Sequence, residues 1–411
     1  MAPVLVPLLV AAVACSPAPA RAEPRADRPH YVVDVRVAPP FRIVTGRLTV
    51  TFAPNRPTNR LVFRLWPNGP PQLRAGSRLD VDVRGSRPNR TTLVLPRRRM
   101  VSFNWRLRLP RNHLDRNAHF NGGVRLGTFL PLLAWDPRRG WLTDPPTRIL
   151  AESAATPAAD FDLHVHAPRG YRVLATGESL GNGRFRAHAV RDIALAVGRF
   201  RVQSATEGGI TIRVASTGKT ANVLDEARSA LRELSSLYGP YPWRTYTVVL
   251  PPDLNDVGIE YPMLSFVGRS PSQFERLVIN HETGHQWFYS LVGNDQARDP
   301  WLDETLATWA QTRLGSPELP PPRNPPQGAG RHVGAPMSYW DKHRRWYVYG
   351  VYGAGVNALQ SLGDNDAVDC ALRSYVARRA YSIAHPGDLL DELNRVIPDA
   401  ERRLRAWGIH R

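Results

Sequence analysis

The feature that most constrains this chain is the motif His-Glu-Thr-Gly-His at residues 281–285, followed after eighteen further residues by Glu304. Histidines four positions apart, here His281 and His285, lie one turn apart on the same face of a helix, with their Cβ atoms about 5–6 Å apart. Both imidazoles can therefore bind one zinc ion, at about 2.0–2.1 Å from each nitrogen. Glu304 supplies a third ligand and leaves a fourth position open, as a catalytic zinc requires. Glu282 lies beside the pair and reaches a water on the metal rather than the metal itself.

The alternative for this motif is a surface helix with two unconnected histidines, because a bare H-E-x-x-H arises by chance in roughly one such chain in a hundred. The surroundings favour the metal. Apolar residues flank the motif on both sides, so the helix is predicted to be buried on more than one side. Buried histidines and a buried glutamate need polar partners, and a zinc ion provides one. A second helix is predicted around Glu304, with Asp299 and Pro300 as its start signal.

Two segments carry a family resemblance. Residues 281–288, His-Glu-Thr-Gly-His-Gln-Trp-Phe, and residues 301–307, Trp-Leu-Asp-Glu-Thr-Leu-Ala, resemble the gluzincin metallopeptidases of the aminopeptidase N family. That family uses H-E-x-x-H, a gap of eighteen residues, and a liganding glutamate followed by small and apolar residues. The order and the rough spacing of the motifs agree with the family pattern.

Further family motifs also have counterparts. The substrate-binding strand of the family, G-x-M-E-N, corresponds to Val-Gly-Ile-Glu-Tyr at residues 257–261, in which Gly258 and Glu260 match. The catalytic tyrosine of the family, which precedes two residues and a glycine, corresponds to Tyr352. Tyr347 matches a second tyrosine of some members.

The resemblance implies an exported zinc-dependent aminopeptidase with one zinc ion per chain, which hydrolyses N-terminal peptide bonds through a zinc-activated water. It implies that Glu282 is the general base and then the general acid, that Tyr352 stabilises the oxyanion, and that Glu260 binds the free α-amine of a peptide. Two alternatives remain open from the residues alone. Glu260 can be an ordinary surface glutamate, and Tyr352 can belong to an aromatic cluster of the core.

Composition fits a globular chain that carries a strong positive charge. With 411 residues, two or three domains are expected. Hydrophobic residues make up 42%, and the formal net charge is +18. Two of the 54 basic residues, Lys219 and Lys342, are lysines, and the others are arginines spread along the chain. No recognition motif and no basic run with interleaved aromatics appears, so no nucleic-acid partner is predicted. A GC-rich coding sequence accounts for the arginines, and a positive surface favours association with an anionic cell envelope.

The first 23 residues indicate export from a bacterial cell. Residues 4–14 form an apolar run of about eleven residues, which suits a signal peptide and is too short to span a bilayer. Residues 20–22, Ala-Arg-Ala, form a cleavage site of the A-x-A type. Alternatively, residues 12–15 resemble a bacterial lipobox, in which Cys15 is lipidated and anchors the protein to the envelope. We therefore expect an extracellular or envelope-anchored protein.

Hydrophobic periodicity predicts an α+β protein of two domains after a signal peptide at residues 1–23. Residues 24–204 contain short alternating strands with proline and glycine turns, which predict an antiparallel β-sandwich-like domain. On one such strand His164 and His166 face away from the apolar side, where a solvated surface is the simpler interpretation than a metal site. Residues 205–411 change to a helical period and form the zinc metallopeptidase domain, which the resemblance implies to be thermolysin-like, with a small edge sheet.

Three functions remain from the sequence. The chain ends soon after the catalytic domain, where larger family members continue into a helical domain that closes the active site. We therefore expect a short bacterial-type member with an open site that acts on peptides or proteins. An open site also allows an endopeptidase. The third hypothesis is a non-catalytic envelope binding protein on the same fold. Retention of Glu282 and Tyr352 favours catalysis, since binding alone needs neither a base nor an oxyanion donor. The sequence indicates no oligomeric state.

Overall fold

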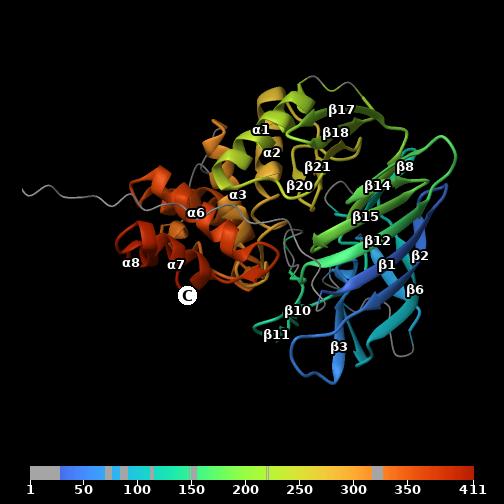
Figure 1. Cartoon of the computed structure of the whole chain (residues 1–411), viewed down its shortest axis with the longest axis horizontal. Helices are drawn as coiled ribbons and strands as arrows, with labels where there is room; N and C mark the ends of the chain where they lie inside the picture. The colour runs from blue at the N-terminus through green and yellow to red at the C-terminus, as the bar shows by residue number, and fades with distance from the viewer. Residues whose placement is uncertain are drawn as a thin grey trace, which may run out of the picture.

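The computed structural model describes residues 28–69, 76–83, 91–111, 115–147, 149, 155–218, 220, 222–316 and 327–411. The expected signal segment and its Cys15 lie outside these residues. A β-rich N-terminal part and a helical C-terminal part lie beside one another along the long axis (Figure 1). This arrangement confirms the expected α+β architecture.

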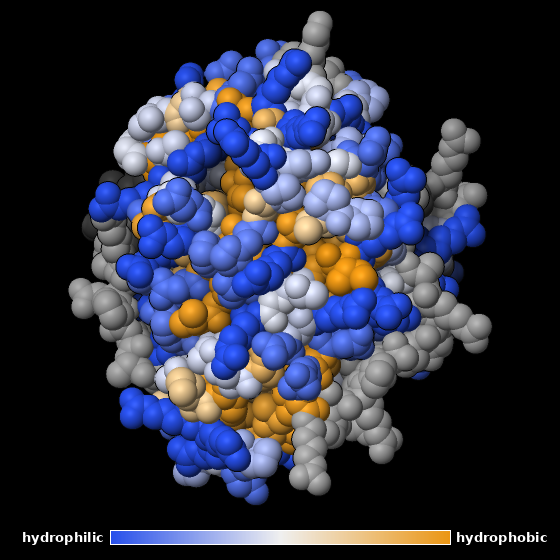
Figure 2. Space-filling view, turned by 90° about the vertical axis from the view of Figure 1, so that its right-hand side faces the viewer, coloured by the Kyte–Doolittle hydropathy of each residue, from blue (hydrophilic) through white to orange (hydrophobic). Residues whose placement is uncertain are grey.

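The largest element of the β domain is a seven-stranded sheet in the order β14-β15-β12-β1-β2-β6-β4. Its strands are antiparallel except for β1 and β12, which pair in parallel. Alternate residues of β1 and β12 point into the core and to solvent, as the period of two predicts. The β-domain side of the molecule is largely hydrophilic, with scattered apolar residues (Figure 2). The strands of this sheet are β1 His30–Val37, β2 Ile43–Thr51, β4 Arg78–Val81, β6 Met100–Arg108, β12 Ala159–His166, β14 Glu178–Gly181 and β15 Arg184–Val190.

Smaller sheets complete the β domain and share its core. A three-stranded sheet has the order β5-β3-β9, a four-stranded sheet the order β13-β16-β8-β7, and a short hairpin joins β10 to β11. Most apolar residues of these sheets belong to the same buried cluster as the inner face of the large sheet. Their strands are β3 Arg60–Arg64, β5 Thr92–Pro96, β7 Ala118–Phe120, β8 Gly123–Gly127, β9 Leu132–Leu133, β10 Trp135–Asp136, β11 Gly140–Trp141, β13 Arg172–Ala175 and β16 Ala194–Gly198.

The helical C-terminal part begins with a five-stranded sheet in the order β17-β18-β19-β21-β20. The helix α1 connects the parallel strands β18 and β19, and β20 lies at the edge, where the sequence predicted an edge strand for the Glu260 segment. The strands are β17 Arg201–Glu207, β18 Ile210–Ser216, β19 Thr245–Leu250, β20 Gly258–Ile259 and β21 Leu264–Val267, and a separate pair joins β22 Gly293–Asn294 to β23 Ile383–Ala384. The helices are α1 Val223–Tyr238, α2 Ser272–Gly284, α3 Trp301–Arg313, α4 Met337–Trp340, α5 Ala354–Gln360, α6 Asn365–Arg379, α7 Pro386–Val396 and α8 Ala400–Leu404.

One sequence expectation about the motif helix is corrected. We expected a helix through the whole motif and the apolar residues behind it, but α2 ends at Gly284. His285 is its C-cap, and its backbone keeps a right-handed helical conformation with φ −62° and ψ −12°. The two imidazoles therefore still meet, with ring centroids 4.7 Å apart. Among the described residues, no helix is both long and apolar enough to cross a membrane.

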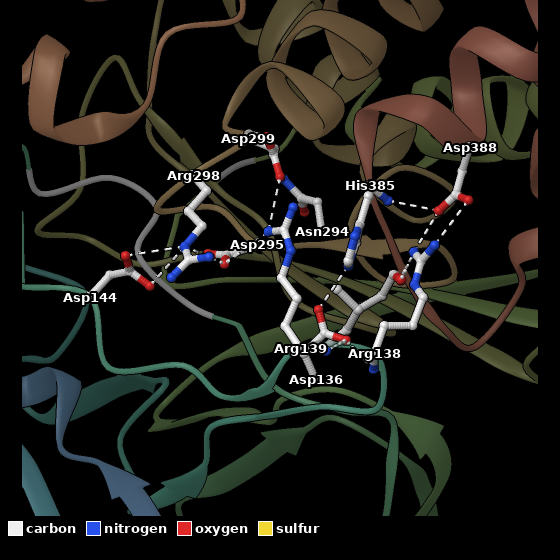
Figure 3. A network of polar contacts seen from close by, with 11 residues as sticks. Asp136, Arg138, Arg139, Asp144, Asn294, Asp295, Arg298, Asp299, His385 and Asp388 are labelled. Carbon is white, nitrogen blue, oxygen red and sulfur yellow. Dashed lines mark hydrogen bonds and ion pairs between the residues drawn. The ribbon is translucent and has the colours of Figure 1, made fainter. Parts of the chain in front are cut away.

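Arginines of the β10–β11 hairpin connect the β domain to the helical C-terminal part (Figure 3). Arg138 donates to both carboxylate oxygens of Asp388 in α7, at 3.1 and 2.5 Å, and to the Ile383 carbonyl at 2.8 Å. Asp136 contacts the His385 ring at 2.8 Å. Burial alone would raise the pKa of Asp136, but its hydrogen bond with His385 and those from the backbone lower it. These contacts are charge-assisted, so they orient the two parts specifically.

We predict that Arg138→Ala weakens this junction. The substitution removes the two-pronged contact with Asp388 and leaves that buried carboxylate with Arg379 at 2.7 Å. Because the Arg138 side chain is 42% exposed, the loss in the free energy of unfolding should be about 1 kcal/mol rather than the larger value of a buried pair. Chemical denaturation measures it. Arg36→Ala, on a side chain that is 72% exposed, is the control and should change stability little; equal losses would contradict the assignment.

Candidate active site

The motif residues come together because α2 packs closely against α3. Gly284 allows this approach, since a Cβ there would meet the Ala307 carbonyl oxygen and the Ala310 Cβ at 3.1 Å. Thr283, on the other side of α2, lies 3.1 Å from the Tyr246 hydroxyl of β19. Helix α2 is thus fixed between the sheet and α3, and Glu304 in the first turn of α3 faces the motif histidines.

Three ligand atoms converge between α2 and α3. The Nε2 atoms of His281 and His285 lie 3.1 Å apart, and Glu304 Oε2 lies 3.2 Å from the first and 3.5 Å from the second. All three residues are buried. Ligands at about 2.0–2.1 Å from a tetrahedral zinc are about 3.3 Å from one another, so the three atoms have the spacing that one zinc ion needs.

The hydrogen bonds of His285 show that this cluster requires a positive charge. Its Nδ1 lies 3.0 Å from the Phe288 carbonyl oxygen, which can only accept, so Nδ1 carries the proton. In the neutral ring Nε2 then carries a lone pair instead of a proton, and this lone pair faces a carboxylate oxygen and a second imidazole. Burial alone would lower the pKa of His285, but the hydrogen bond and charge of Glu304 raise it well above its usual value. The residues therefore fit a zinc ion, and the Phe288 carbonyl fixes the tautomer that binds it.

Glu282 lies next to the three ligands without joining them. Its side chain is buried, and its Oε2 atom has no hydrogen-bond partner among the described residues. Burial raises the pKa of Glu282 well above its usual value, against the opposing effect of His285, and the nearby carboxylates Glu260 and Glu304 raise it further. Gly258 of β20 leaves the space for this carboxyl group, because a Cβ at residue 258 would lie 2.0 Å from Glu282 Oε1.

Glu260 faces the same site and already has a cationic neighbour. One ligand atom each of Glu260, Glu282 and His285 lies within 4.8 Å of the others. The Arg116 guanidinium of the β domain lies 3.6 Å from Glu260 Oε1, and it also donates to the Tyr261 hydroxyl at 3.3 Å. Glu260 is therefore a buried carboxylate at the site rather than the surface glutamate that the sequence left open as an alternative.

Tyr352 lies at the site and Tyr347 lies behind it. The Tyr352 ring is stacked on the His281 ring, with centroids 5.5 Å apart and planes 9° apart. Tyr347 is buried and packs edge-on against Tyr352, with ring centroids 5.8 Å apart. The segment Val348–Gly353 is a single stretch of π-helix, and the Thr305 hydroxyl of α3 donates to its Val351 carbonyl at 2.6 Å. This contact ties the tyrosine to the helix that carries Glu304.

Sequence reasoning missed several residues that position the site. Gln286 accepts from the Met263 backbone at 2.9 Å and donates to the Tyr261 carbonyl at 3.0 Å, so it holds the strand segment that carries Glu260. Gln296 donates to Asp303 at 2.8 Å and lies 3.5 Å from Glu260. Burial, with the charge of Glu304, raises the pKa of Asp303 to about 8. Gln286 directly follows the motif and Asp303 directly precedes Glu304. This closeness in the sequence was the only signal that could have pointed to these residues.

Arg116 was also not identified from the sequence as a residue of the site. Nothing in the sequence pattern around this arginine distinguished it. Its proximity to Glu260 depends on how the β domain packs against the edge strand.

A β domain followed by a helical domain with a buried His-His-Glu cluster defines a zinc metallopeptidase of the gluzincin class. Residues 223–321 match the family model described as the Peptidase family M1 domain. This segment contains α1, the edge strand, both motif histidines and Glu304. Residues 223–321 thus carry the M1 peptidase domain of the aminopeptidase N-type gluzincins, and zinc is the cofactor that this family implies.

Curated relatives match about a quarter of this chain, and this chain spans only a small part of their length. Aminopeptidase RNPEPL1 of Homo sapiens is 37% identical over 103 residues, which cover 24% of this chain and 14% of that protein. Aminopeptidase B of Rattus norvegicus is 37% identical over 84 residues, or 20% of this chain and 13% of that protein. Leukotriene A-4 hydrolase of Xenopus laevis is 33% identical over 93 residues, or 22% of this chain and 15% of that protein.

Solved structures match nearly the whole fold. The M1 zinc metallopeptidase from Deinococcus radiodurans has a TM-score of 0.60 at 21% identity, over 93% of both chains. A mutant of a Deinococcus radiodurans M1 zinc metallopeptidase, bound to a Tyr-Ser-Ala substrate, has a TM-score of 0.58 at 20% identity, over 94% of this chain and 95% of that one. At this identity the likeness concerns the fold, and it supports the two-part architecture.

We predict that Glu304→Gln weakens zinc binding while the fold is kept. The amide has the shape of the carboxylate but lacks its charge, so affinity for zinc should fall by at least about tenfold. The zinc content after dialysis and the rise of Tm on adding Zn²⁺ measure this effect. Glu233→Gln, on an exposed glutamate of α1, is the control. Equal zinc contents in wild type and Glu304→Gln would show that the three atoms do not bind the metal.

Proposed function

We propose that this protein is a zinc-dependent aminopeptidase that hydrolyses N-terminal peptide bonds. The observation that carries the proposal is the convergence of two carboxylates, Glu282 and Glu260, on the same side of the His-His-Glu cluster. The cluster alone suits any zinc enzyme. Glu282, a carboxylate that does not bind the metal, supplies proton transfer. Glu260 supplies a contact for a cationic peptide terminus.

The chemistry divides between the metal and the chain. Zinc held by His281, His285 and Glu304 would polarise a substrate carbonyl and make water a nucleophile near neutral pH. Glu282 is a buried carboxyl group beside the three ligands, and burial raises its pKa above the usual value. We assign to it the removal of a proton from the attacking water and its delivery to the leaving amine. Gly258 keeps the space in which this carboxyl group moves.

Tyr352 is the proposed donor to the developing oxyanion. Its ring is stacked on the His281 ring, which places the residue beside the metal ligands. A single donor of this kind contributes about 2.7–4 kcal/mol to the lowering of a reaction barrier. Tyr347 packs against it, so we assign Tyr347 to holding the Tyr352 ring in place rather than to contact with substrate.

Arg116 favours a second candidate function, an endopeptidase or a peptidase with weak dependence on a free amine. Glu260 is the carboxylate proposed to bind the α-ammonium group of the substrate, but the Arg116 guanidinium lies only 3.6 Å from it. An arriving ammonium group must share Glu260 with this arginine. The attraction for a free amine is therefore smaller than for an unpaired buried carboxylate.

We also propose export to the bacterial envelope or the medium. The support is the apolar run at residues 4–14 with its cleavage-site and lipobox patterns, together with the net charge of +18. Cell fractionation, with mass spectrometry of the mature N-terminus, distinguishes a signal peptide cleaved after Ala22 from a lipidated Cys15. Recovery of the uncleaved chain in the cytoplasm would contradict the proposal.

We predict that Glu282→Gln abolishes turnover and retains zinc. The amide cannot take a proton from water, so kcat should fall by about 10²–10⁴-fold on an aminoacyl reporter substrate. Zinc content should remain that of the wild type, because Glu282 is not among the three ligand atoms. Glu275→Gln, in the first turn of the same helix, is the control. A Glu282→Gln variant that keeps most of the wild-type rate would assign the base to another residue.

A pair of variants tests whether Glu260 binds a free amine. Glu260→Gln should lower kcat/KM on a free-amine peptide by about tenfold or more, and leave its N-acetylated analogue unaffected, because a charged hydrogen bond contributes about 1.5–3 kcal/mol. Arg116→Gln should have the opposite effect and increase the preference for the free amine. Equal cleavage of both peptides by wild type and variants would favour the endopeptidase, whereas no cleavage by zinc-loaded wild type would favour a binding protein.

A further inference from the structure

The outer face of the seven-stranded sheet carries a second group of metal-ligating side chains. Asp34 lies on β1, and His164 and His166 lie on the neighbouring strand β12. Residues two apart on a strand point to the same face, and the parallel register pairs Asp34 with His164. The intervening Val33, Val35 and the other inward residues are buried, so these three side chains project to solvent.

The three side chains converge on one atom. Asp34 Oδ2 lies 2.8 Å from His166 Nε2 and 3.9 Å from His164 Nδ1. The two imidazole centroids are 4.0 Å apart, and one ligand atom of each residue lies within 4.8 Å of the others. Ligand atoms of a tetrahedral zinc are roughly 3.3 Å apart, so one of the two Asp34 distances is shorter than this value and the other is longer. Small rotations of half-exposed side chains close the remaining difference.

A simple hydrogen-bonded pair accounts less well for this group. The same two strands carry such a pair, in which His30 Nε2 lies 2.9 Å from Asp162 Oδ2. Asp162 has one imidazole there, and its other oxygen accepts from Arg186 at 2.7 Å. Asp34 Oδ2 instead faces two imidazoles, with His166 Nε2 at 2.8 Å and His164 Nδ1 at 3.9 Å. Its other oxygen faces Arg36 at 3.9 Å, where the arginine is 72% exposed and its charge is screened.

We propose that Asp34, His164 and His166 form a second, solvent-facing site for a divalent transition-metal ion of the zinc type. Two imidazoles and one carboxylate are a donor set that such ions accept, and the fourth position is open to water. The backbone of two hydrogen-bonded strands fixes the ligand positions, which suits a preformed site. The sheet belongs to the β domain, so this site is separate from the motif cluster and does not depend on the proposed peptidase activity.

Zinc titration of the full chain tests this site. After removal of metal by a chelator, wild type should bind one more Zn²⁺ per chain than His166→Gln or His164→Gln, as measured by calorimetry and by metal analysis after dialysis. Asp34→Asn should weaken this second binding event by about tenfold or more. Peptide hydrolysis by zinc-loaded protein should be unchanged in all three variants, since none of these residues lies at the motif cluster. Circular dichroism confirms that the variants fold.

His30→Gln is the matched control. It removes the neighbouring histidine from the same face and leaves the three ligands intact, so it should bind as many zinc ions as wild type. Two results would overturn the proposal. In the first, wild type and His166→Gln bind the same number of zinc ions; in the second, His30→Gln loses as much zinc as His166→Gln. Both results are independent of whether the protein cleaves peptides.

Discussion

Three buried side chains hold electron-pair donors within 3.5 Å of one another, an arrangement that calls for a cation between them. The surrounding residues can be understood from this requirement. Gly284 brings α3 close enough for Glu304 to face the histidines. The Phe288 carbonyl fixes the tautomer of His285. Burial raises the pKa of the nearby carboxyl groups of Glu282 and Asp303.

The metal cluster was predictable because local geometry determines it. The spacing of His281 and His285 fixes their separation on any helix, and the family pattern supplied the distance to Glu304. The same reasoning failed at the end of α2. Apolar residues continue beyond Gly284, but Gln286 uses its side chain to hold the strand segment, and the chain turns there. Hydrophobic periodicity does not record such a use of a polar side chain.

Contacts between distant segments were outside the reach of sequence reasoning. Arg116 and Glu260 are far apart in the chain, and their meeting depends on the packing of two domains. The alternation of apolar and polar residues in β12 correctly placed His164 and His166 on the solvent-exposed face. The sequence did not indicate which strand would lie beside them. The parallel partner brought Asp34 to them. The π-helical stretch that carries Tyr352 likewise has no signature in the order of its residues.

The parallel pairing of β1 with β12 also has a consequence for how the chain acquires its structure during synthesis. Asp34 and His166, on neighbouring strands in the middle of the large sheet, are 132 positions apart. The first strand leaves the ribosome long before β12 exists, and of its two neighbours in the sheet only β2 is beside it in the meantime. Such long-range pairing slows folding and leaves a strand edge open to other chains.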